Sequence, residues 1–136
     1  MSRILIIDDE RLVRLTLRKI LERAGYEVIE AANGSEGIKR HQEEPADLII
    51  TDIIMPEKEG LETIIELRQR QPTLKIIAIS GGGRAGPESY LEMARQFGAE
   101  HVFEKPFSPK EVLATIKDCL LTDAPERQAD AAVETG

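Results

Sequence analysis

The residues that could do chemistry in this 136-residue chain are acids that directly follow apolar runs. Asp8 and Asp9 follow the run at residues 3–7, and Asp52 follows the run at 48–51. Carboxylates that converge on one place repel one another, and a bound cation or proton relieves this repulsion. Mg²⁺ is a hard cation that prefers such oxygen ligands. The sequence therefore predicts an acidic metal pocket, in which one carboxylate can also be a reaction centre.

Two further apolar runs end in a hydroxyl and an ammonium group. Ser80 ends the run that begins at residue 75, and Lys105 follows the run at 102–104. This combination suits phosphoryl transfer, because a metal ion and a lysine neutralise the transferring group while a hydroxyl donates to one of its oxygens. A carboxylate can be the nucleophile and form an aspartyl-phosphate. Asp52 is the best candidate, because its strand is expected between the metal-binding acids and Lys105. Glu10 is expected in the first turn of a helix, where its charge favours the helix dipole.

The elements that must position these groups alternate between strand and helix. We expect strands at residues 3–8, 26–31, 47–51, 75–80 and 101–105, and helices at 10–24, 34–44, 59–71, 87–97 and 108–121. Such alternation is typical of an α/β fold with a parallel sheet covered on both faces. The second strand mixes polar and apolar residues, so we place it at an edge, and the more apolar first and third strands in the centre. The prediction is a doubly wound five-stranded parallel sheet of order 2-1-3-4-5, with the strand-end groups at one rim.

Composition narrows the classes of function. Acidic residues outnumber basic ones 25 to 18, which gives a net charge of −7 and opposes binding to nucleic acid or anionic membranes. The single cysteine, Cys119, excludes an internal disulfide and is expected to pack as a small apolar residue. His41 and His101 are expected on the surface, since neither lies at the rim. Without a membrane span or a signal peptide, we expect a cytoplasmic protein.

The end of the chain differs from the rest. From residue 122 the sequence is polar and offers little apolar surface to bury. We therefore predict one domain over residues 1–121 and a disordered tail over 122–136.

The strand-end motifs resemble those of response-regulator receiver domains of two-component signalling, over about residues 2–121. The matching pieces are Asp8-Asp9 after the first strand, Asp52 followed by Met55-Pro56 and Gly60, Ser80 at the end of the fourth strand, and Lys105-Pro106-Phe107 after the fifth. The resemblance implies a flavodoxin-like (βα)5 fold. It further implies that the chain is similar to stand-alone receivers of the chemotaxis type, which relay phosphate or dock on a target protein.

The resemblance also assigns roles in the pocket. Asp52 would accept a phosphoryl group from a phosphohistidine on a sensor histidine kinase or a histidine phosphotransfer protein. Asp9 and Asp52 would ligate Mg²⁺ directly, Asp8 would act through water, and the backbone carbonyl of Ile54 would be a third protein ligand. Such a protein is not an enzyme for other substrates. It catalyses only its own phosphorylation and its own slow dephosphorylation.

A switch follows from the same resemblance. Ser80 would hydrogen-bond the phosphoryl group and Lys105 would form an ion pair with it. The signalling surface for a downstream protein target, whose identity the sequence does not specify, would lie on the fourth helix, the fifth strand and the fifth helix. The residues expected on or beside this surface are Ser89, Tyr90, Met93, Val102 and Lys105.

Three positions depart from the family pattern. Val102 stands where Tyr or Phe is common, and Phe103 should face the other side of the sheet. A switch by rotation of an aromatic ring is therefore not expected, whereas movement of Ser80 and its loop is. Ile54 is aliphatic and can restrict water, and Gly82 has no side chain to position it. We therefore expect slow intrinsic dephosphorylation.

Two other functions compete with a phosphorelay receiver. One is a haloacid-dehalogenase-like phosphatase, which also uses an aspartate nucleophile and Mg²⁺ but has its nucleophile in an Asp-x-Asp motif after the first strand. Here Asp8 and Asp9 are adjacent and Asp52 is central. The other is a degenerate receiver that serves only as a scaffold or dimerisation module, against which the intact set of acids argues.

Overall fold

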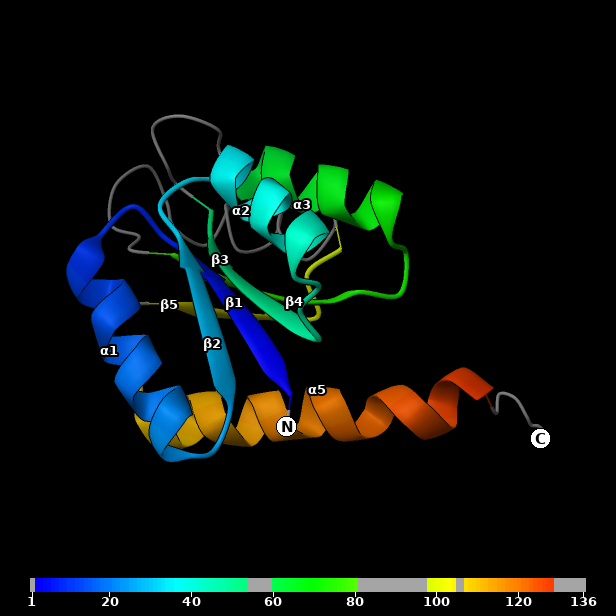
Figure 1. Cartoon of the computed structure of the whole chain (residues 1–136). Helices are drawn as coiled ribbons and strands as arrows, with labels where there is room; N and C mark the ends of the chain where they lie inside the picture. The colour runs from blue at the N-terminus through cyan, green and yellow to red at the C-terminus, as the bar shows by residue number, and fades with distance from the viewer. Residues whose placement is uncertain (1, 54–59, 81–97, 105–106, 129–136) are drawn as a thin grey trace.

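The computed structural model of the chain describes residues 2–53, 60–80, 98–104 and 107–128 (Figure 1). The elements in chain order are β1 (Arg3–Ile7), α1 (Arg11–Arg23), β2 (Glu27–Ala31), α2 (Gly34–Glu43), β3 (Leu48–Asp52), α3 (Gly60–Arg70), β4 (Lys75–Ser80), β5 (His101–Glu104) and α5 (Pro109–Gln128). The helix predicted at 87–97 lies outside the described residues. Among the residues that the structure describes, no helix is long and apolar enough to cross a membrane.

The five strands form one parallel sheet in the order β2-β1-β3-β4-β5, which confirms the predicted order. The apolar strand β1 is central and the mixed strand β2 is at the edge, as their compositions predicted. The register pairs Ile7 of β1 with Thr51 of β3, and Asp52 with Ile79 of β4. The carboxyl ends of β1, β3 and β4 therefore lie next to one another.

Helices cover both faces of the sheet, with α1 and α5 on one face and α2 and α3 on the other (Figure 1). Successive strand residues point to opposite faces, so each strand contributes to both cores. In β1, Ile4 and Ile6 pack with α1 and α5, whereas Leu5 and Ile7 pack on the α2 and α3 side. All four of these side chains are fully buried. Burial on both faces is why β1 is a continuous apolar run and does not alternate with polar residues.

Local signals fix where several helices begin and end. Gly25 adopts a positive φ of 97° after α1, which is typical of a glycine that ends a helix. The side chain of Asn33 accepts a hydrogen bond from the Glu36 backbone N–H at 2.8 Å, and so caps α2. Ser108 caps the last helix, because its Oγ accepts a hydrogen bond from the Glu111 N–H at 3.4 Å.

Two features differ from the sequence predictions. Helix α5 continues to Gln128, beyond residue 121 where we expected the tail to begin. The domain boundary itself stays a prediction, and residues 129–136 lie outside the described residues.

His41 is buried, with 8% of its surface exposed, so the prediction of a surface position was wrong. Its Nδ1 accepts from the Ala46 N–H at 3.0 Å and its Nε2 lies 2.9 Å from Gln71 Oε1, where it can donate. These two hydrogen bonds compensate the burial of the ring nitrogens.

Helix α2 packs against β1 at Gly37, where a Cβ atom would lie only 2.3 Å from Ile7 Cδ1. Alanine has the better helix propensity, by about 1 kcal/mol. We nevertheless expect Gly37→Ala to lower the free energy of unfolding, because overpacking a close contact costs about 1–3 kcal/mol. Urea unfolding measures the change. Combination with Ile7→Val, which removes Cδ1, should make Gly37→Ala less costly, and strictly additive effects would contradict this contact.

Candidate functional site

Three carboxylates meet at the carboxyl ends of β1 and β3. Asp8, Asp9 and Asp52 each offer one oxygen, and these oxygens all lie within 4.8 Å of one another. Asp8 is fully buried and Asp52 is 4% exposed, whereas Asp9 is exposed. The pocket therefore has a floor that is shielded from water and one acid that is open to solvent.

Residues of β2, of α1 and of the connection from β1 to α1 bind Asp8 at three of its atoms. Its backbone N–H donates to the Ala31 carbonyl at 3.1 Å, and its backbone carbonyl accepts from Arg14 Nη1 at 2.8 Å. Its side-chain Oδ1 accepts from the Glu10 N–H at 2.8 Å, at the start of α1. Glu10 itself is the N-cap residue and its exposed side chain makes no capping hydrogen bond. We expected Glu10 in the first turn of the helix, but it precedes that turn as the N-cap residue. In the described part of the chain, the acidic group consists of Asp8, Asp9 and Asp52.

The donor set of this pocket fits a hard divalent cation. Such ions take several carboxylate and carbonyl oxygens and keep part of their water shell. Two shielded carboxylates beside one exposed carboxylate provide close oxygens and an opening for water. Asp8, Asp9 and Asp52 are the residues that would hold the ion.

The structure describes some of the other predicted site residues but not all of them. Ser80 is the last residue of β4 and pairs with Glu104 of β5, so its backbone lies at the same rim as Asp52. Val102 packs on the α2 and α3 side of the sheet and Phe103 packs on the α1 and α5 side, as strand alternation predicted. The remaining predicted site residues lie outside the described residues: Ile54, Tyr90, Met93 and Lys105.

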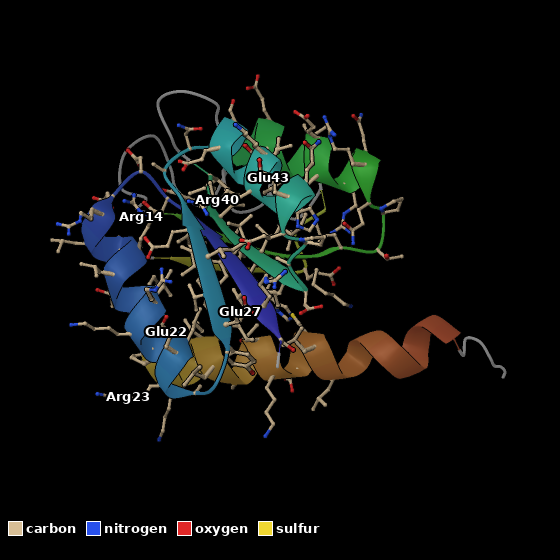
Figure 2. All side chains as sticks on the ribbon, in the orientation of Figure 1. Arg14, Glu22, Arg23, Glu27, Arg40 and Glu43 are labelled. Carbon is tan, nitrogen blue, oxygen red and sulfur yellow. The ribbon has the colours of Figure 1, made fainter. Side chains whose placement is uncertain are left out.

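Sequence reasoning missed Arg14, which contacts Asp8, and Glu30, to which Arg14 is bound. Arg14 Nε pairs with Glu30 Oε1 at 3.0 Å while Arg14 Nη1 reaches the Asp8 carbonyl. Arg14 extends from the first part of α1 toward the carboxyl end of β2 (Figure 2). The available signal was the pair Arg14 and Arg18 at helical spacing, together with a glutamate in the edge strand.

Comparison with known proteins agrees with this geometry. The chain matches the response regulator receiver domain over residues 4–117 and belongs to that family. It is 36% identical over 116 residues to the chemotaxis protein CheY of Thermotoga maritima, covering 85% of this chain and 94% of that protein. It is also 36% identical over 120 residues to the alkaline phosphatase synthesis transcriptional regulatory protein PhoP of Bacillus subtilis. That match covers 88% of this chain but only 48% of PhoP, so the chain spans about half of that regulator.

Solved structures show the same fold. A CheY-like response regulator receiver domain from Methanospirillum hungatei superimposes with a TM-score of 0.85 at 31% sequence identity. The superposition covers 93% of this chain and 98% of that one. The five-stranded sheet and its helices are therefore the flavodoxin-like receiver fold that the motifs predicted.

Mg²⁺ is expected to stabilise the protein, because it offsets the repulsion among the three carboxylates. At a concentration about tenfold above its Kd it should add about 1.4 kcal/mol, which raises the thermal midpoint by about 5 °C. Asp52→Asn should raise the midpoint in EDTA by removing one like charge, and should lose most of the response to Mg²⁺. Thermal unfolding followed by circular dichroism measures both effects. Asp118→Asn, at an exposed aspartate of α5, is the control and should respond like the wild type.

The Glu30 ion pairs are expected to add a pH-dependent contribution to stability. Partial burial raises the pKa of Glu30, but hydrogen bonds from Arg18 and Arg14 outweigh it, so its pKa lies below the ordinary 4.5. A group whose pKa is lower in the folded state stabilises the fold at pH values above its pKa in the unfolded state. This stabilisation is lost as the pH falls through its pKa in the folded state. Glu30→Gln should therefore cost about 1–2 kcal/mol at neutral pH. In urea unfolding, the difference in the free energy of unfolding between Glu30→Gln and wild type should shrink below about pH 4. A difference that stays constant with pH would contradict the contribution of the Glu30 ion pairs.

Proposed function

We propose that this chain is a phosphorelay receiver that accepts a phosphoryl group on Asp52, with Mg²⁺, from a histidine kinase or a histidine phosphotransfer protein. The observation that carries this proposal is the convergence of Asp8, Asp9 and Asp52 within 4.8 Å. Membership of the receiver family supports it, since these acids follow the strands that the family motifs specify. The downstream target would be a protein that recognises the phosphorylated surface.

The proposed reaction transfers a phosphoryl group from an imidazole nitrogen of the partner protein to a carboxylate oxygen of Asp52. A carboxylate oxygen of Asp52 donates an electron pair to phosphorus, and the bond from phosphorus to the partner's imidazole nitrogen breaks, with its electron pair staying on that nitrogen. Bound Mg²⁺ supplies positive charge that neutralises the oxygens of the transferring group. Asp52 suits the role of nucleophile because it is nearly buried, which limits the access of water to the acyl phosphate. Asp8 suits a supporting role, because the Glu10 N–H already binds its Oδ1.

A change of surface would follow phosphorylation. In this proposal Ser80 hydrogen-bonds the phosphoryl group and Lys105 pairs with it. The movement of Ser80 would reach β5 through its strand pairing with Glu104. Tyr90, Met93 and Val102 would belong to the surface that a target protein reads. We also propose that the chain acts in the cytoplasm, binds neither nucleic acid nor membrane, and has no other substrate.

Phosphotransfer from a panel of histidine kinases tests the proposal directly. The wild type should acquire an acid-stable, hydroxylamine-labile phosphoryl group in the presence of Mg²⁺, because that lability identifies an acyl phosphate. Asp52→Asn should acquire none, and Asp118→Asn should behave as wild type. Label that persists in Asp52→Asn would refute Asp52 as the acceptor. Hydrolysis of phosphomonoesters that Asp8→Asn abolishes but Asp52→Asn does not would favour a phosphatase.

The same labelled protein reports the rate of dephosphorylation. We expect slow loss of phosphate, because the residue two after Asp52 is the aliphatic Ile54, which would restrict water, and the residue two after Ser80 is Gly82, which has no side chain to position it. After removal of the kinase, the decay of the label in the isolated protein with Mg²⁺ gives its half-life. A half-life of only seconds would contradict slow dephosphorylation while leaving Asp52 as the acceptor.

A further inference from the structure

We propose that Arg14 is a positioning residue for the acidic pocket. Its guanidinium group joins the Asp8 carbonyl to the carboxylate of Glu30, and so fixes the turn that carries Asp8 and Asp9. The inference rests on the proposed function, because the turn would be positioned for Mg²⁺ binding.

Two nitrogens of the Arg14 guanidinium group donate hydrogen bonds to two different partners. Nη1 donates to the Asp8 carbonyl at 2.8 Å, and Nε donates to Glu30 Oε1 at 3.0 Å. The Arg14 side chain is 17% exposed, so water competes little with these bonds. A planar guanidinium holds its donors in a fixed fork, and a lysine does not. The position of the Asp8 backbone is therefore tied to that of Glu30 in β2.

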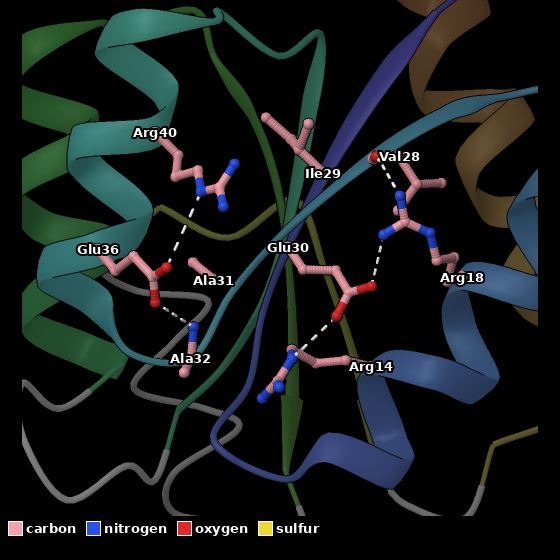
Figure 3. Close-up of a pocket in the computed structure, with 9 residues that line it drawn as sticks. All are labelled: Arg14, Arg18, Val28, Ile29, Glu30, Ala31, Ala32, Glu36 and Arg40. Carbon is pink, nitrogen blue, oxygen red and sulfur yellow. Dashed lines mark hydrogen bonds and ion pairs between the residues drawn. The ribbon is translucent and has the colours of Figure 1, made fainter.

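Glu30 is itself held on its other oxygen. Arg18 Nη1 lies 2.5 Å from Glu30 Oε2, and Arg18 Nη2 donates to the Val28 carbonyl at 3.1 Å. Figure 3 shows Glu30 between Arg14 and Arg18, in a polar cleft of about 420 Å³ between α1, β2 and α2. Because both carboxylate oxygens are bound, Glu30 is a fixed anchor for Arg14.

This anchor acts on the residues that would hold the metal. Among the described residues that bind Asp8, Ala31 and Glu10 act through backbone groups, whereas Arg14 acts through its side chain. Loss of the Arg14 bond removes this side-chain support from the turn. Removal of a side chain that orients a metal ligand typically weakens metal binding about 10–100-fold. The positive charge of Arg14 is offset by Glu30, so the effect should be one of geometry.

Titration of the full chain with Mg²⁺, by isothermal calorimetry and by amide NMR shifts, tests the inference. Arg14→Gln should weaken Mg²⁺ binding about tenfold. Arg18→Gln is the matched control, because it removes the other partner of Glu30 and leaves the bond to Asp8. Its Mg²⁺ affinity should stay within about threefold of wild type, although both variants lose an ion pair and some stability in urea without Mg²⁺.

A third variant separates geometry from charge. Arg14→Lys keeps the positive charge but not the fork, so it should remain several-fold weaker than wild type. Wild-type affinity in Arg14→Lys, or in Arg14→Gln, or equal weakening by Arg14→Gln and Arg18→Gln, would overturn the positioning role. If the wild type bound no Mg²⁺, the proposed function would fail and this inference with it. Wild-type binding with an unaffected Arg14→Gln would overturn the inference alone.

Discussion

The parallel pairing of β1 with β3 is the constraint on which the rest of the structure depends. Both strands are buried on two faces, and their register aligns Ile7 with Thr51. A shift by one residue would move every apolar side chain of a strand to the wrong face, so the register is strongly specified. The same register leaves Asp8, Asp9 and Asp52 together where the strands end. The packing of the core therefore determines that like charges meet at one rim.

Such a cluster opposes folding, and the neighbouring backbone limits its cost. The Glu10 N–H at the start of α1 stabilises the Asp8 carboxylate, at the helix end where negative charge is favoured. Asp9 remains exposed and so keeps its hydration. A bound cation, or a change of charge on Asp52, would alter the repulsion that remains among the three carboxylates. A pocket with weaker repulsion would respond less to either change.

The strand order and the rim of acids could be predicted because they follow from apolar runs and from the residues that end them. The caps at Gly25 and Ser108 could be predicted for the same local reason. The burial of His41 could not, since its partners Ala46 and Gln71 come from loops whose positions depend on packing. The contact of Arg14 with Asp8 was missed because it depends on how α1 lies across β2. Sequence thus predicted the groups at strand ends better than the side chains that hold them.

Hydrogen bonds hold the amino ends of the strands, at the opposite end of the sheet from the acids. There Arg68 donates to the carbonyls of Pro72 and Leu74 at 2.6 Å each, and also to that of Gly98. The Arg3 N–H similarly binds the Asp47 side chain at 2.8 Å. These bonds tie β1, β4 and the start of β5 to the turns around them, far from the acids. A site is positioned best on elements that are held rigidly. Because the amino ends are tied in this way, the charge that the proposed phosphorylation would add to Asp52 would be relieved most easily by movement at the carboxyl ends of β4 and β5.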